Sequence, residues 1–184
     1  MLRARFVSFW FYPTVGPLVL YSAGRLDSAH QWRELFWLVP AGLLFWTALE
    51  YGLHRFVFHL RPRSKVAARI LASLHLRHHG DPRNRERILV RLPYSVSMSI
   101  FLLVVLTPVL GSLFRSAGLL AGIWAGFLYY ELVHYRVHLS KSNGGLLAYQ
   151  RRSHFHHHYV DEGYCFGVTS PLWDRVLGTY KRTE

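Results

Sequence analysis

Four long runs of uncharged residues alternate with the charged parts of this chain of 184 residues. They cover residues 6–24, 35–49, 92–114 and 116–130 and are 19, 15, 23 and 15 residues long. A helix needs about 20 mostly apolar residues to cross the hydrocarbon core of a bilayer. The first and third runs meet this length directly, and the other two meet it when the helix continues to His54 and His134. The pattern predicts an all-α integral membrane protein with transmembrane helices at about 6–24, 35–54, 92–114 and 116–134.

Both short runs end in a glutamate that is followed by a histidine. Glu50 precedes His54, and Glu131 precedes His134. An ionisable group at the end of a span usually faces protein rather than lipid. A carboxylate beside a metal-bound imidazole can accept the N–H of the other ring nitrogen and so orient the ring. We predict this supporting role for both glutamates. The alternative is that each one pairs with a nearby arginine and serves folding only.

The basic residues predict which side of the membrane each segment occupies. The chain has 22 Lys and Arg against 10 Asp and Glu, a formal net charge of +12. With four spans, 19 of the basic residues lie on the side that holds residues 1–5, 55–91 and 135–184, and 3 lie on the other side. The positive-inside rule places the first side and both termini in the cytoplasm. Anionic lipid then accounts for the charge, and no nucleic acid partner is implied.

The cytoplasmic segments contain two further predicted helices. Residues 64–79 read as an amphipathic helix with Ser64 as its N-cap, and we expect it to lie on the membrane surface with its histidines turned inward. Residues 146–160 form the second helix, which follows a turn at residues 143–145. Asp161 and Glu162 are expected to lie in a solvated turn.

Histidine is the unusual residue of this chain, and ten of the twelve histidines fall into four clusters. The clusters are His54-x4-His59, His75-x2-His78-His79, His134-x3-His138 and His154-x2-His157-His158. Residues at i, i+3 and i+4 share one helix face, so each HxxHH motif is predicted to offer three nitrogens to one centre. His54 and His59 are about 140° apart on an ideal helix and share a face only if the helix ends between them.

Ten nitrogens exceed what one metal ion binds, so the simplest arrangement is two metals with about five imidazoles each. Imidazole suits iron, zinc, copper and nickel, whereas a structural zinc site closes with four ligands. Two imidazole-rich metals beside apolar spans indicate oxidative chemistry on a lipid. His30 lies on the opposite side of the membrane and His156 points away from its neighbours, so neither is expected to be a ligand. The single Cys165 excludes an internal disulfide framework.

The ordered histidine motifs resemble those of the fatty acid hydroxylase superfamily of membrane di-iron enzymes. Within that superfamily, Glu50-Tyr-Gly-Leu-His-Arg-Phe-Val-Phe-His59 is similar to the fatty acid and ceramide 2-hydroxylases. So is the segment Phe166-Gly-Val-Thr-Ser-Pro-Leu-Trp-Asp-Arg-Val-Leu-Gly-Thr-Tyr180. The similarity runs from about residue 35 to the end and implies one hydroxylase-type membrane domain over residues 1–184, with a cytoplasmic histidine-rich cap.

The resemblance implies a monooxygenase that hydroxylates the acyl chain of a fatty acid or ceramide-like lipid, with C2 as the position in the most similar group. It carries over all ten clustered histidines as ligands of two iron ions, with zinc possible in the purified protein, and O2 as co-substrate. No fused cytochrome b5 domain fits before residue 6, so the electrons are expected from an external cytochrome b5-like protein or ferredoxin. The alternatives are a sterol or carotenoid oxidase or desaturase with the same site, and a non-catalytic metal-binding membrane protein.

Overall fold

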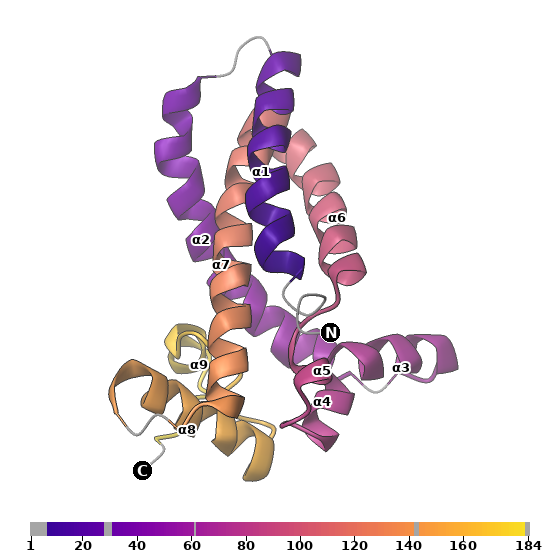
Figure 1. Ribbon diagram of the computed structural model, residues 1–184, viewed down its shortest axis with the longest axis vertical. Helices are drawn as coiled ribbons and strands as arrows, with labels where there is room; N and C mark the ends of the chain where they lie inside the picture. Colours follow the sequence, from indigo (N-terminus) through magenta and orange to yellow (C-terminus); the bar gives the residue numbers. More distant parts are fainter. Residues whose placement is uncertain (1–6, 28–30, 61, 142–143, 183–184) are drawn as a thin grey trace. The chain divides into compact units, whose positions relative to one another are not determined.

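The computed structural model describes residues 7–27, 31–60, 62–141 and 144–182, and these residues form helices and loops without a β-strand (Figure 1). The all-α prediction is therefore confirmed. The helices are α1 (Val7–Leu26), a 3-10 turn (Trp32–Glu34), α2 (Leu35–Gly52), a π-helix (Leu53–Phe58), α3 (Lys65–Leu71), a second π-helix (Ala72–Leu76), α4 (Arg77–Gly80), α5 (Arg85–Ile88), α6 (Leu92–Leu110), α7 (Leu113–Leu139), α8 (Gly145–Tyr159) and α9 (Leu172–Val176).

The chain forms two compact units. The first comprises residues 1–46 and 91–128, and the second comprises residues 47–90 and 129–184. Helices α2 and α7 each begin in the first unit and end in the second, so the histidine-bearing ends of both helices belong to the second unit. The assignment of all 184 residues to one hydroxylase-type domain stays a prediction.

In the first unit, α2 and α7 approach each other closely through glycines. A Cβ atom placed on Gly42 of α2 would lie 2.0 Å from the Leu119 carbonyl oxygen, and one on Gly122 of α7 would lie 2.0 Å from the Val39 carbonyl oxygen. Small residues at a helix crossing allow this close approach. It is common between helices in a membrane, where the hydrophobic effect does not drive association.

Aromatic side chains join the other helices of the first unit to α7. Tyr12 of α1 packs against Trp124 and Phe127, with ring centroids 5.0 and 5.8 Å apart. The indole N–H of Trp124 donates a hydrogen bond of 2.9 Å to the Ser99 hydroxyl of α6. Helix α7 is therefore the central element of this unit.

Among the described residues, three helical segments are long and apolar enough to cross a membrane: Trp32–Phe58, Arg85–Leu110 and Leu113–Leu139. Many large apolar side chains on them point outward, including Trp37 and Val104, which are 73% and 66% exposed. Such exposure suits contact with lipid tails. The predicted span at about residues 6–24 corresponds to helix α1, which is less apolar than these three segments. By helix length and apolar composition, the structure supports three of the four predicted spans.

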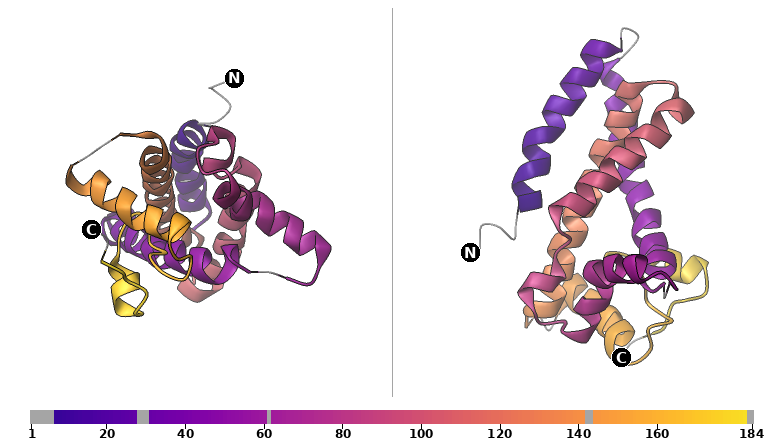
Figure 2. Two further views of the ribbon diagram at one scale, coloured as in Figure 1. Left: turned by 90° about the horizontal axis from the view of Figure 1, so that it is seen from below. Right: turned by 90° about the vertical axis from the view of Figure 1, so that its right-hand side faces the viewer.

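The second unit contains the predicted amphipathic helix, in a modified form. The Ser64 hydroxyl caps α3 by accepting from the Ala67 N–H at 3.4 Å, as the sequence predicts. The helix does not run unbroken to residue 79, because the π-helix at Ala72–Leu76 separates α3 from α4. Helix α3 projects from the rest of this unit (Figure 2).

Candidate metal centre

The second unit brings all ten clustered histidines together in two groups of five. In each group, one nitrogen of every ring lies within 4.8 Å of the others. The first histidine group is His54, His59, His75, His79 and His157, and the second histidine group is His78, His134, His138, His154 and His158. The two-by-five division matches the count expected from the sequence.

The two HxxHH motifs divide their histidines between the groups, and the prediction that each motif serves one centre is wrong. His75 and His79 belong to the first group, but His78 belongs to the second. His154 and His158 belong to the second group, but His157 belongs to the first. The reason is geometric: position i+4 lies about 40° to one side of position i, and position i+3 lies about 60° to the other side. Adjacent histidines therefore face different centres.

The π-helix at Leu53–Phe58 explains how the HX4H motif places both histidines in one group. An α-helix separates residues five apart, but a π-helix closes i to i+5 hydrogen bonds and brings such residues onto one face. The rings of His54 and His59 are stacked, with centroids 5.3 Å apart. The sequence predicted that the helix must end between these residues, and this is confirmed, because the π-helix ends at Phe58, directly before His59.

The ring nitrogens within each group converge at the spacing of ligands around one metal ion. In the first group, the Nε2 atoms of His54 and His79 lie 3.0 and 2.8 Å from His75 Nε2. In the second group, those of His78 and His154 lie 2.9 Å from His138 Nε2. Two nitrogens bound at about 2.1 Å lie about 3.0 Å apart when they are 90° apart around the metal, and about 3.4 Å apart at the tetrahedral angle. The residues fit two metals with five or six ligands each.

Burial keeps the imidazoles in the form that binds metal. Desolvation, together with the neighbouring imidazoles, lowers the pKa of His75 and of His154 well below 6.5. Desolvation also lowers the pKa of His157. A neutral imidazole offers a lone pair, and metal binding needs that deprotonated form. The groups are therefore suited to hold cations without first losing protons.

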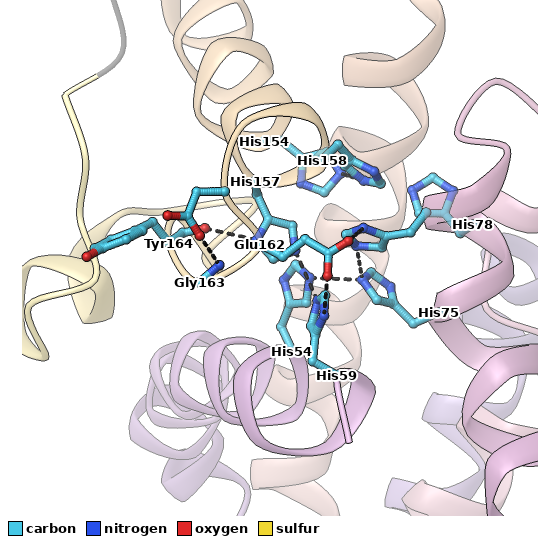
Figure 3. A network of polar contacts seen from close by, with 12 residues as sticks. His54, His59, His75, His78, His154, His157, His158, Glu162, Gly163 and Tyr164 are labelled. Atoms are coloured by element: carbon cyan, nitrogen blue, oxygen red, sulfur yellow. Dashed lines mark hydrogen bonds and ion pairs between the residues drawn. The ribbon is translucent and has the colours of Figure 1, made fainter. Parts of the chain in front are cut away.

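The C-terminal loop contacts the rings of the first histidine group, and Figure 3 shows Glu162 and Tyr164 of this loop beside them. The Nδ1 atoms of His54 and His157 lie 2.5 and 2.9 Å from the carbonyl oxygens of Phe166 and Tyr164. The two carboxylate oxygens of Glu162 lie 3.7 Å from His59 Nδ1 and 3.4 Å from His79 Nδ1.

Glu162 corrects the expectation of a merely solvated turn. The residue does lie in a turn and its side chain is 52% exposed, but its carboxylate faces two ring nitrogens of the first group. The sequence signal that was available is an acidic residue directly after the second HxxHH motif. The backbone carbonyls of Tyr164 and Phe166 leave no such signal, because every residue has a carbonyl.

The second histidine group has a different surrounding. Within the described residues, the Nδ1 atoms of all five of its rings are buried and have no hydrogen-bond partner, whereas in the first group this holds only for His79. Buried polar atoms are nearly always satisfied, and an exception calls for an explanation such as ordered water or a bound ion nearby. The two groups therefore have similar ligands but unequal support.

Glu50 supports His54 indirectly, and the predicted direct contact between them is absent from the structure. The Glu50 carboxylate accepts the backbone N–H groups of Val168 and Thr169 at 2.7 and 2.8 Å, and the Thr169 hydroxyl at 2.5 Å. The ring of His54 is oriented by the carbonyl of Phe166 instead. Glu50 thus fixes the loop that carries that carbonyl.

Glu131 likewise does not contact the histidine that follows it. Its carboxylate accepts the Val90 N–H at 3.0 Å, while the Nδ1 atom of His134 has no partner. The arginine closest to Glu50 in sequence, Arg55, donates to the Tyr51 hydroxyl at 2.6 Å. Both buried glutamates attach loops of the second unit to the ends of long helices.

Asp174 holds the C-terminal loop in its bent course. Its carboxylate accepts the N–H groups of Phe166 and Gly167 at 2.9 and 2.8 Å and the Thr179 hydroxyl at 2.8 Å. A Cβ atom on Gly167 would lie 2.1 Å from the Ser170 carbonyl oxygen, so only glycine fits there. The segment 166–180, which carries the sequence resemblance, therefore holds in place the Phe166 carbonyl that contacts His54.

Of the two histidines that were not expected to be ligands, the structure describes only His156. His156 lies on α8 between ligand candidates, yet its ring belongs to neither group. His30 lies outside the described residues. The identification of the ten histidines as metal ligands stays a proposal, which we take up below.

Comparison with known proteins identifies the class of this histidine-rich membrane protein. The family model for fatty acid hydroxylases matches residues 39–179. The chain is 31% identical to a dihydroceramide fatty acyl 2-hydroxylase of Arabidopsis thaliana over 172 residues, which are 92% of this chain and 72% of that protein. It is 32% identical to a ceramide very long chain fatty acid hydroxylase of Saccharomyces cerevisiae, over 94% of this chain and 46% of that protein.

A solved structure shows the same fold. The chain matches full-length scs7p, of which only the hydroxylase domain is visible, with a TM-score of 0.84 and 28% identity over 97% of this chain and 67% of that one. The chain therefore belongs to the fatty acid hydroxylase family. It is an oxidoreductase, and the reaction of its family is the hydroxylation of a fatty acyl chain.

Proposed function

We propose that this protein hydroxylates the acyl chain of a membrane lipid, a fatty acid or a ceramide-like lipid, at C2. The two histidine groups each bind one iron ion. The relatives named above as 2-hydroxylases support the position of attack, and their names include dihydroceramide and ceramide substrates.

The observation that carries the proposal is the pair of five-nitrogen groups. Neighbouring Nε2 atoms lie 2.8 to 3.0 Å apart, which favours ligands about 90° apart over a closed tetrahedral zinc site. A metal with five imidazoles at that angle keeps one position open. Iron accepts imidazole ligands and such coordination, so the geometry supports iron over structural zinc.

When bound, the two iron ions would use O2, two electrons and two protons to convert one C–H bond into C–OH, with the second oxygen atom leaving as water. The chain's own residues hold the ions and keep bulk water away. His154 and His157 are completely buried, and His54 is 3% exposed. Water exclusion matters because an oxidant strong enough to attack an alkyl C–H bond also reacts with solvent and side chains.

The electrons come from an external protein, such as a cytochrome b5-like protein or a ferredoxin. The second unit exposes several arginines outside the histidine groups, among them Arg77, Arg83 and Arg85. Clustered positive charge steers an acidic partner toward a surface. The histidine groups and both termini lie on the cytoplasmic side, in line with the distribution of basic residues.

The experiment that tests the proposal is lipid mass spectrometry of a host that lacks this reaction, grown under 18O2. Expression of the chain should add an 18O-labelled 2-hydroxy acyl lipid, and the His54→Ala variant should not. The His156→Ala variant is the matched control, because it removes a neighbouring imidazole that belongs to neither group. A labelled isoprenoid would instead favour a sterol or carotenoid oxidase, a new double bond would favour a desaturase, and metal without any product would favour a non-catalytic protein.

A further inference from the structure

We infer that the two metal positions are unequal, and that the acceptor loop, residues 162–166, makes the first histidine group retain its metal more firmly than the second. The inference rests on the proposed function, since it concerns the metals of that site. It starts from the observation that acceptors for the ring N–H groups lie beside the first group, whereas the second has none in the described part of the chain.

The acceptor loop contacts two imidazole rings through its backbone carbonyls. An imidazole that binds metal through Nε2 carries its hydrogen on Nδ1, and an acceptor for that hydrogen fixes the ring and raises its basicity. The carbonyls of Tyr164 and Phe166 supply this acceptor to His157 and His54. Cys165, between them, has a φ of 57° in the left-handed region. This conformation turns the chain so that successive carbonyls on either side of Cys165 face different rings.

Glu162 contacts two more imidazole rings through its side-chain carboxylate. Its oxygens lie at ion-pair distance from the Nδ1 atoms of His59, which follows the first π-helix, and of His79, which lies on α4. His79 Nδ1 is buried and has no hydrogen bond within the described residues, so the Glu162 carboxylate is the acceptor group beside it. One carboxylate therefore links histidines from two separate segments. The neighbouring Asp161 does not take part, because its carboxylate accepts the Gly163 N–H at 2.8 Å. In the described part of the chain, the contact with these two rings belongs to Glu162 and not to Asp161.

The second histidine group lacks this support. In the part of the chain that the structure describes, its five Nδ1 atoms are buried without a hydrogen-bond partner, so no described residue fixes the direction of their hydrogens. Loss of an outer hydrogen-bond partner typically reduces metal affinity by about 10–100-fold. We therefore expect the second group to release its metal first, although both groups contain five imidazoles.

The test is a chelator challenge of the purified full-length chain loaded with 57Fe(II), with the retained iron measured over time. The wild type should lose its iron in two phases of equal amplitude whose rates differ by about 10-fold or more. His138→Ala should remove the fast phase, and His59→Ala should remove the slow phase. These two variants assign each phase to its histidine group.

The decisive comparison is between Glu162→Gln and Asp161→Asn, which remove one negative charge each from adjacent positions. Glu162→Gln should accelerate the slow phase by about 10-fold and leave the fast phase unchanged. It should also shift only one of the two Mössbauer doublets, which a merely structural role in the turn would not do. Asp161→Asn should leave both phases and both doublets as in the wild type.

Two results would overturn the inference: loss of both irons at one rate in the wild type, or equal behaviour of Glu162→Gln and Asp161→Asn. A chain that binds no iron at all would instead contradict the proposed function. A circular dichroism melt of each variant identifies any that fails to fold. In that case Glu162→Asp, which keeps the charge but shortens its reach, replaces Glu162→Gln in the comparison.

Discussion

The imidazole rings of His79 and His158 stack on each other with their centroids 4.1 Å apart. Each ring is the last histidine of an HxxHH motif, and each belongs to a different histidine group. The stack therefore places the two groups side by side within the second unit. The same motifs exchange their middle histidines, His78 and His157, across this boundary. Each metal position therefore takes one histidine from the motif that supplies two histidines to the other position.

We expect the exchanged histidines to act on the metal of the opposite motif. In a background with His134→Ala and His138→Ala, which disables the second group, the protein should retain about one metal ion. Replacing His157 by Ala in that background should remove this metal, because His157 completes the first group. Replacing His78 should change little. Metal content per protein, measured by mass spectrometry of the elements, decides the matter, and equal losses from the two replacements would show that the grouping is wrong.

We expect Glu50 to contribute to stability through the C-terminal loop. Glu50→Ala leaves the N–H groups of Val168 and Thr169 without their acceptor, and each buried unsatisfied group costs about 1–3 kcal/mol. The free energy of unfolding should fall by about 2 kcal/mol or more. Glu50→Gln keeps one acceptor oxygen and should cost about 1 kcal/mol.

The measurement is denaturant unfolding in detergent, combined with limited proteolysis of residues 160–180. Thr169→Val serves as a reference, since it removes only the hydroxyl bond to the carboxylate. Equal losses from Glu50→Ala and Glu50→Gln would argue against the role of the backbone contacts.

We expect Gly122 to be required for the packing of α2 against α7. Gly122→Ala places a Cβ atom 2.0 Å from the Val39 carbonyl oxygen, a backbone atom that cannot move by itself. Overpacking of this kind typically costs about 1–3 kcal/mol. The matched control is Gly16→Ala in α1, where the nearest atom, on Trp124, lies 3.5 Å away. The yield of monodisperse protein and its melting temperature should fall for Gly122→Ala alone, and a comparable fall for both would contradict this account.

We expect four crossings, with both termini in the cytoplasm. Reporter fusions at the N-terminus, after Arg63, after Ser112 and at the C-terminus should read in, in, out and in, because the basic residues lie mainly on one side. The N-terminal fusion distinguishes three spans from four. If α1 does not cross, the N-terminus lies opposite Arg63, and only the spans Trp32–Phe58, Arg85–Leu110 and Leu113–Leu139 remain.

The sequence by itself determined the class of structure and the composition of the site. Bilayer thickness sets the length of a hydrophobic run that can span the membrane, so the long helices α2, α6 and α7 could be predicted from the sequence alone. The histidine spacing was also sufficient, because imidazoles repeated at helical intervals have few other uses. The count of ten nitrogens in two groups of five followed from coordination number alone.

Only the tertiary structure decided which histidine serves which group and what supports each ring. Periodicity gives directions on one helix, but the assignment of His78 and His157 depends on how helices from distant parts of the chain meet. The spacing of His54 and His59 did not indicate the π-helix that directly precedes His59. The supporting contacts of Phe166 and Tyr164 come from backbone carbonyls, which every sequence contains, so their selection is set by the course of the loop. The position of Glu50 at the end of a span indicated a role, but its hydrogen-bond partner Val168 lies 118 residues away in the sequence. Such a long-range contact is fixed only when the chain has folded.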